Sequence, residues 1–100
     1  MIEVNKISGI GEYCEKQEKE RKLYLTPEND KAFLVVNKNT FEMRCDRELS
    51  KLLQAQYESV MESRYFGRGG IEIVNSGQLP DNEIEDLIRL SYNLSVELEA

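Results

Sequence analysis

Residues 31–45, KAFLVVNKNTFEMRC, decide the fold class of this chain. Within them, residues 32–36 form the longest apolar run of the sequence, which has the length of a strand buried on both faces. The Asn-Lys-Asn stretch at 37–39 favours a turn, because asparagine tolerates the positive φ of tight hairpins. Residues 40–45 alternate Phe, Met and Cys with Thr, Glu and Arg, which predicts a half-buried strand. The segment therefore predicts two antiparallel strands near the centre of a sheet.

The chain before this hairpin predicts one more strand and a helix. Residues 22–26 (KLYLT) suit a strand, and Pro27 begins a turn into the hairpin, so three strands form a meander. Residues 7–20 place apolar side chains at helical spacing and pair glutamates with lysines four positions later. This pattern predicts a short amphipathic helix with a solvated end, although Gly9 and Gly11 weaken its start.

The chain after the hairpin predicts two helices separated by two strands. Asp46 is a natural N-cap for a helix with one apolar stripe. A short edge strand is expected within residues 58–66, centred on 63–66, then a flexible turn at 67–70 and a further strand. Residues 79–81 (LPD) open the most apolar helix, which is expected to cover a sheet face. The expected order is α-β(3)-α-β(2)-α: a single α+β domain over residues 1–100, a two-layer sandwich with a mainly antiparallel sheet packed by helices.

The composition excludes most catalytic chemistry. The chain has 100 residues and no His, which removes Ser-His-Asp and Cys-His catalysis and His-based zinc sites. Cys14 and Cys45 lie 31 positions apart, and two thiols cannot build a zinc site without other soft ligands. We expect both thiols to be reduced and at least partly buried. We also expect no enzyme activity, no metal and no cofactor.

Charge and hydropathy bear on partners and location. The formal charge is −6, from 13 basic and 19 acidic residues. Residues 1–50 hold nine basic and ten acidic residues, whereas residues 51–100 hold four and nine. A polyanion-binding domain usually shows the opposite excess. No apolar run is long enough to cross a membrane, and the N-terminus lacks an apolar signal region, so a cytoplasmic protein is expected.

Three segments carry a resemblance to a known family. RCDRELSKLL at 44–53 corresponds to a strand that runs into a C/T-[SD]-x-E-L-[AS]-x-x-L helix, and QYESVMESR at 56–64 continues the match. SGQLPDNEIEDLIRLSYNL at 76–94 corresponds to D-G-S-L-P-D-x-[EQ]-[IL]-x-x-L-[IV]-x-x-S-Y. On these motifs, residues 31–98 resemble the MmcQ/YjbR-like family of small bacterial proteins. The resemblance implies the fold of secretion chaperones, in the same α-β(3)-α-β(2)-α order.

The resemblance also implies DNA binding, because members of this family are described as DNA-binding proteins with a double-wing arrangement. The family carries H-x-N-K-x-H-W before its last strand, where this chain has YFGRGG at 65–70. Tyr65 stands at the first His and Arg68 at the Lys, while glycines replace the second His and the Trp. Arg64, Tyr65 and Arg68, with Lys51, are therefore the candidate nucleic-acid contacts, since cations meet phosphates and aromatic rings stack on bases.

Three other interpretations stay open. One of them is an unrecognised enzyme, which would need a concave pocket lined by carboxylates of perturbed pKa. Glycine-rich turns between strands are common, so Tyr65 and Phe66 also suit packing against the sheet. The sheet edge near residues 63–66 and the acidic C-terminal helix suit a protein-interaction module or a homodimer with no nucleic-acid role.

Some polar groups of the C-terminal half have a simpler explanation than catalysis. The carboxylate pairs Glu83 with Asp86 and Glu97 with Glu99 suit helix capping and solubility. Tyr92 is expected to bury its ring and to leave its hydroxyl at the surface or bonded to the backbone.

Overall fold

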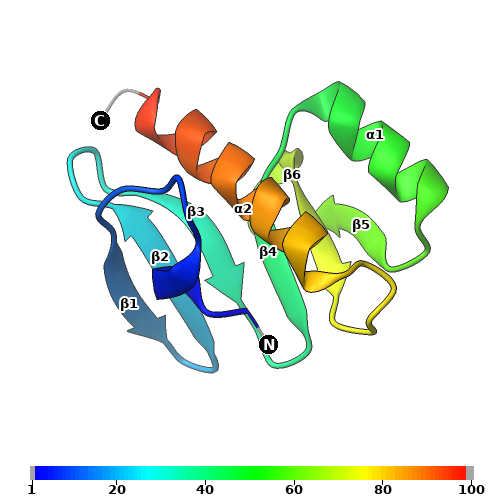
Figure 1. Cartoon of the computed structure of the whole chain (residues 1–100), viewed down its shortest axis with the longest axis horizontal. Coiled ribbons are helices and arrows are strands. Elements are labelled where there is room, and N and C mark those ends of the chain that lie inside the picture. The colour runs from blue at the N-terminus through cyan, green and yellow to red at the C-terminus, as the bar shows by residue number, and fades with distance from the viewer. Residues whose placement is uncertain (1, 99–100) are drawn as a thin grey trace.

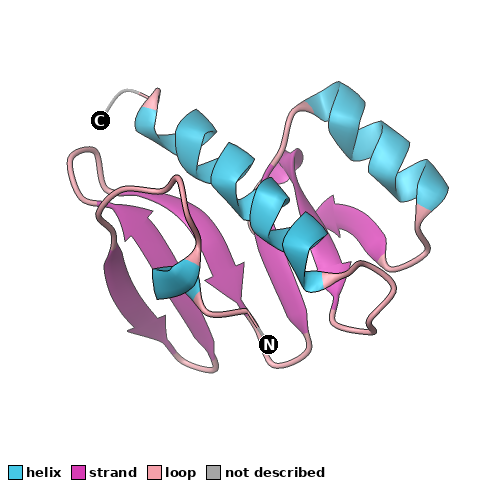
Figure 2. Cartoon of the chain, viewed as in Figure 1, coloured by secondary structure: helices cyan, strands magenta, loops and turns pink. Residues whose placement is uncertain are grey.

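The computed structural model describes residues 2–98, which form a six-stranded antiparallel sheet with two α-helices on one face (Figures 1 and 2). The elements in chain order are the 3-10 helix η1 (Val4–Lys6), β1 (Cys14–Glu18), β2 (Arg21–Thr26), β3 (Lys31–Val36), β4 (Thr40–Arg44), α1 (Arg47–Gln56), β5 (Val60–Ser63), β6 (Gly67–Val74) and α2 (Asp81–Val96). This arrangement confirms the α+β class with helices packed on an antiparallel sheet. Within residues 2–98, no helix has the length and apolarity that crossing a bilayer requires.

The strand order is β1-β2-β3-β4-β6-β5, so the predicted meander forms one half of the sheet. The edge strand expected within residues 58–66 is confirmed as β5, but its centre lies earlier than the predicted residues 63–66. Residues 67–70 are not a turn but the start of β6, where the Gly69 carbonyl accepts a hydrogen bond from the Cys45 N–H (2.9 Å). The turn falls instead on residues 64–66, and Gly70 lets β6 fit beneath it, since a Cβ atom at Gly70 would lie 2.6 Å from the Phe66 Cβ.

The N-terminal helix expected over residues 7–20 is wrong. The chain follows α2 without regular structure and then enters β1, which pairs with β2. The Tyr92 hydroxyl donates to the Glu12 carbonyl oxygen (2.8 Å), and Ile7 is buried. Gly11 permits this approach, since a Cβ atom there would lie 2.7 Å from the Tyr92 hydroxyl. Burial and hydrogen bonds with α2 and β2 therefore outweigh the local helical spacing.

The sheet has a buried cluster on each face. Alternation along β2 and β3 places Tyr24 and Leu34 toward the helices and Leu23 and Val35 on the opposite face. A bulge in β3 adds Phe33 to the helix side, because Leu25 pairs with Ala32 while Tyr24 pairs with Leu34. We call the side under α1 and α2 the helix face, and the other side the second face.

Helix α2 supplies hydrogen bonds where β3 and β4 separate at one end of the sheet. Pairing of β3 with β4 ends at Leu34 and Met43, so the next backbone groups separate. The Ser91 hydroxyl fills this gap: it accepts from the Arg44 N–H (2.8 Å) and donates to the Phe33 carbonyl (2.6 Å). A side chain of α2 thus replaces a missing rung of the ladder and fixes α2 over β3 and β4.

Candidate functional site

The turn at residues 64–66 folds across the second face instead of projecting as a wing. Phe66 packs on the cluster of Leu23, Leu25, Ala32 and Val35. The Arg44 guanidinium lies 4.8 Å from the centre of the Phe66 ring. Tyr65 reaches further, and the Arg21 guanidinium from β2 lies 5.0 Å from the centre of its ring. The two aromatic side chains thus cover the sheet, as the packing alternative expected.

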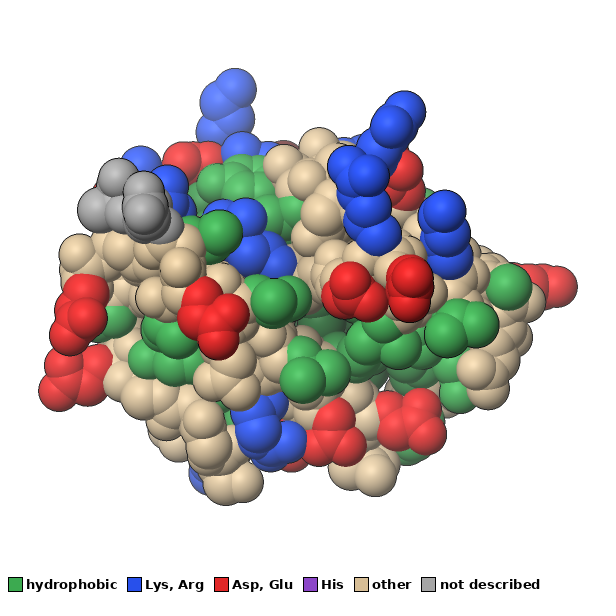
Figure 3. All heavy atoms as spheres, turned by 90° about the horizontal axis from the view of Figure 1, so that it is seen from above, with side chains coloured by type: hydrophobic (Ala, Val, Ile, Leu, Met, Phe, Trp, Pro, Cys, Tyr) green, Lys and Arg blue, Asp and Glu red, His purple; other side chains and the backbone are tan. Residues whose placement is uncertain are grey.

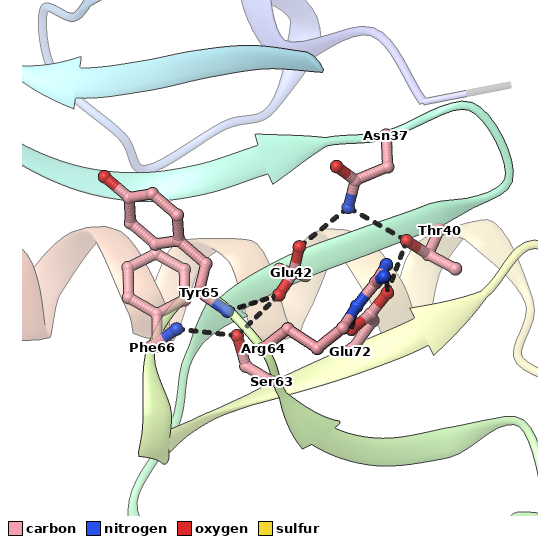
Figure 4. A network of polar contacts seen from close by, with 8 residues as sticks. All are labelled: Asn37, Thr40, Glu42, Ser63, Arg64, Tyr65, Phe66 and Glu72. Carbon is pink, nitrogen blue, oxygen red and sulfur yellow. Dashed lines mark hydrogen bonds and ion pairs between the residues drawn. The ribbon is translucent and has the colours of Figure 1, made fainter. Parts of the chain in front are cut away.

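Two buried glutamates lie beneath this turn (Figure 4). Glu42 of β4 and Glu72 of β6 are directly opposite in register and are 2% and 1% exposed. Glu42 accepts three hydrogen bonds from uncharged donors: the Ser63 hydroxyl and the Tyr65 N–H at 2.8 Å, and the Asn37 amide at 2.7 Å. Like charges opposite each other in a sheet repel, so these donors stabilise the pair and hold the turn in place.

Glu72 is paired with a cation. Arg64 donates from Nε to one carboxylate oxygen (3.0 Å) and from Nη2 to the other (2.7 Å), and the Thr40 hydroxyl adds a third bond (2.8 Å). The Arg64 hydrogen bonds lower the pKa of Glu72 against the opposing effect of burial. Figure 4 shows Arg64 crossing from the turn to Glu72 and Thr40. Arg64 therefore orients the turn, although its side chain is 74% exposed.

A groove opens beside this network at one end of the sheet. It has a volume of about 840 Å³ and is lined by residues 18–21 of the β1–β2 turn, residues 37–40 of the β3–β4 turn, and Arg64. We call it the arginine groove. Arg21 and Arg64 are each held by a glutamate through Nε and Nη2; Arg21 donates to one oxygen of Glu18 at 3.3 and 2.9 Å. The pKa of Glu18 is lowered by its Arg21 hydrogen bond.

The chemistry of the arginine groove suits an anion. Because each carboxylate engages Nε and Nη2, Nη1 of both guanidinium groups has no hydrogen-bond partner among residues 2–98. Lys19 and Lys38 add two ammonium groups to the lining, and Glu20 adds one further carboxylate. Orientation of a planar guanidinium before binding reduces the entropy lost when it contacts phosphate or carboxylate.

The four residues predicted to contact nucleic acid do not form one surface. Arg64 and Tyr65 lie on the second face, as described above. Lys51 is exposed on α1, whose apolar residues pack on the helix face. Arg68 is exposed near the start of β6. Within the described residues, neither Lys51 nor Arg68 has an ion-pair partner.

Sequence reasoning missed the glutamate pair. Alternation along β4 predicted that Glu42 and Arg44 face solvent, and this is wrong for Glu42 because the turn at residues 64–66 covers it. A signal was present, since Glu42 and Glu72 each stand between two large apolar residues. Alternation alone cannot tell a solvated sheet face from one that a loop covers.

The remaining polar candidates are structural. Among residues 2–98, no three His, Cys, Asp or Glu side chains converge as metal ligands. Asp86 forms an ion pair with Arg89 (2.7 Å), and Glu99 lies outside the described residues. The expectation for Tyr92 is confirmed by its bond to backbone.

The two cysteines differ in environment. Cys45 is buried, and burial raises the pKa of its thiol to about 11. Cys14 is exposed, so the expectation that it is at least partly buried is wrong. It begins β1, an edge strand covered on neither face at that position.

Comparison with known proteins supports the architecture. No family model matches the sequence, and no curated protein matches it. The chain superposes on the crystal structure of the Deinococcus radiodurans protein DR2400, described as a DUF419 domain, with a TM-score of 0.76. The fold is shared with a DUF419 protein. The alignment covers 91% of this chain and 73% of that chain at 15% identity.

The likeness agrees with the α+β fold that the sequence predicted. At 15% identity it shows the fold alone.

Proposed function

We propose that this chain is a non-enzymatic binding module of the MmcQ/YjbR-like type that contacts DNA phosphates through the arginine groove. The observation that carries the proposal is the pair of guanidinium groups, each held by a carboxylate and each with Nη1 available, in one groove. The DNA-binding role itself comes from the resemblance stated above. The expected cytoplasmic location is compatible with it.

The proposal changes the residues expected to bind. Arg64 remains a phosphate contact, and Arg21, Lys19 and Lys38 join it. Tyr65 acts by holding Arg21, because the guanidinium lies over its ring and Phe66 lies against it at 4.8 Å between ring centres. Binding then rests on phosphate contacts rather than on stacked bases, which predicts weak sequence preference.

The net negative charge of the chain limits its affinity for DNA. A formal charge of −6 repels DNA at long range, so attraction is local to the groove. We expect dissociation constants on the order of 10–100 µM at physiological salt, the range of non-specific binding. Affinity should fall steeply with salt, with a logarithmic slope of about 0.7 for each phosphate contact to a single strand.

The test is fluorescence anisotropy of labelled single- and double-stranded oligonucleotides over a salt series. Arg21→Gln and Lys38→Gln each remove one charge from the groove, whereas Lys51→Gln and Arg68→Gln remove one charge outside its lining. The groove variants are expected to weaken binding and to reduce the salt slope by about 0.7 each for a single strand, and the outside variants are expected to match wild type. Arg64 is left intact because its loss would also disturb Glu72.

Two results would contradict the proposal. One is the absence of any anisotropy change at low salt with either oligonucleotide. The other is an equal loss of affinity in Arg21→Gln and Lys51→Gln, which would show that only overall charge matters.

A further inference from the structure

A second surface, on the opposite side of the sheet from the arginine groove, is apolar. Between the start of α1 and the outer side of α2 lies a groove of about 230 Å³, which we call the interhelical groove. It is lined by Arg44, Cys45, Asp46, Leu49, Leu87, Leu90, Asn93, Leu94 and Glu97. Figure 3, seen from above relative to Figure 1, shows apolar side chains in a broken band, with acidic and basic side chains on either side of it.

Two leucines of this groove are exposed to solvent although they adjoin the apolar core. Leu90 and Leu94 are 49% and 38% exposed, and they lie four residues apart on one stripe of α2. Leu87 is buried beneath them, and Leu49 packs on the helix-face cluster. The stripe therefore continues the apolar core out to the surface. An exposed apolar stripe that lines a groove suits association with an apolar side chain of another protein.

The charge around the groove indicates the charge of the partner. Asp46, before α1, and Glu97, after α2, flank the leucines as exposed carboxylates. Arg44 is the one basic lining residue within the described chain, and its Nε is engaged by the Ala32 carbonyl (2.9 Å) and the Ser95 hydroxyl (3.1 Å). Helix α2 itself carries four acidic residues and one arginine. The lining residues and α2 therefore carry a net negative charge, which favours a basic partner.

We propose that the interhelical groove binds a basic amphipathic helix of a partner protein. A volume of about 230 Å³ lies below the ~300–1,000 Å³ of small-molecule pockets, and it suits one or two apolar side chains of a helix laid along the groove. Apolar residues three or four positions apart would enter between the leucines, and flanking lysines or arginines would meet Asp46 and Glu97. A second copy of this chain fits less well, because a symmetric dimer brings the same acidic rims together.

The test uses a fluorescein-labelled synthetic helix of Lys, Ala and Leu, with leucines at three- and four-residue spacing, as the probe. Leu90→Gln and Leu94→Gln are each expected to weaken binding about tenfold, because each removes an apolar contact. Leu52→Gln is the matched control: Leu52 is 66% exposed on α1 but does not line the groove. Glu97→Lys is expected to weaken binding of the basic peptide and to strengthen binding of a peptide with Glu in place of Lys.

Several outcomes would overturn the inference. Equal binding of a peptide with the same composition but scrambled leucine positions would show charge attraction alone. Equal losses of peptide affinity in Leu52→Gln and Leu90→Gln would show that the interhelical groove is not the binding site. A wild-type dimer in sedimentation that Leu90→Gln converts to monomer would assign the groove to a second copy. Arg21→Gln should leave peptide affinity unchanged, so this test and the DNA test fail independently.

Discussion

The two faces of the sheet are stabilised in different ways. Under the helices, the described chain buries fourteen apolar residues in one cluster. The second face has four buried apolar residues and two buried carboxylates under a three-residue turn. An apolar core tolerates substitutions that keep its volume, whereas a buried carboxylate requires donors at fixed positions. The second face thus restricts the residues at its buried positions more strictly than the helix face does, although it buries less apolar surface.

The largest expected effect is a cavity in the helix face. Phe33 is fully buried and its ring lies 5.0 Å from that of Tyr92. Phe33→Ala should lower the free energy of unfolding by about 3–5 kcal/mol, measured by urea denaturation. Leu23→Ala on the second face should cost less, about 2–3 kcal/mol, because only a turn covers it. A greater loss from Leu23→Ala would contradict the comparison.

The carboxylate pair should give the next largest effect. Glu72→Gln keeps the shape but replaces charge-assisted hydrogen bonds to Arg64 and Thr40, and it should cost about 1–2 kcal/mol. Glu62→Gln is the control, because Glu62 is exposed on the neighbouring strand β5 and should change stability by less than ~0.5 kcal/mol. Equal stabilities of the two variants in urea would show that the network contributes nothing.

Acid should separate Glu72→Gln from wild type. Because the folded-state pKa of Glu72 is lowered from its ordinary value of 4.5, the folded chain binds this proton less readily than the unfolded chain. The stabilisation is complete above pH 4.5 and is lost as the pH falls through the lowered folded-state pKa. Urea midpoints between neutral and acidic pH should therefore fall less in Glu72→Gln than in wild type. Parallel curves would contradict this assignment.

The smallest effect should come from the stacked cation. Arg21→Gln removes the guanidinium from the Tyr65 ring and from Glu18, and it should cost less than about 1 kcal/mol because both contacts face solvent. Thermal denaturation measures this loss, with Lys51→Gln as the control because Lys51 is exposed and has no ion-pair partner among residues 2–98. A loss as large as that of Glu72→Gln would mean that Arg21, rather than Arg64, holds the turn.

Local sequence patterns predicted most of the sheet but not its second face. The strands over residues 22–26, 31–36 and 40–45 and the cap at Asp46 were predictable, because alternation and capping are local. The segment at residues 7–20 was not, since its structure depends on α2 and β2. The positions of Arg64 and Tyr65 were equally inaccessible, because their partners Glu72 and Arg21 come from strands that only the folded topology brings near.

The Ser91 hydroxyl that joins Arg44 to Phe33 has a consequence for synthesis on the ribosome. The strands β1–β3 can pair as soon as they emerge, but the seam between β3 and β4 lacks its last rung until α2 is available. Residues 81–96 come last among the described elements, so a nascent chain holds an open seam and an uncovered apolar face through most of translation. Completion of this fold is therefore a late event that waits for α2, which brings both the Ser91 hydroxyl and the cover of the apolar face.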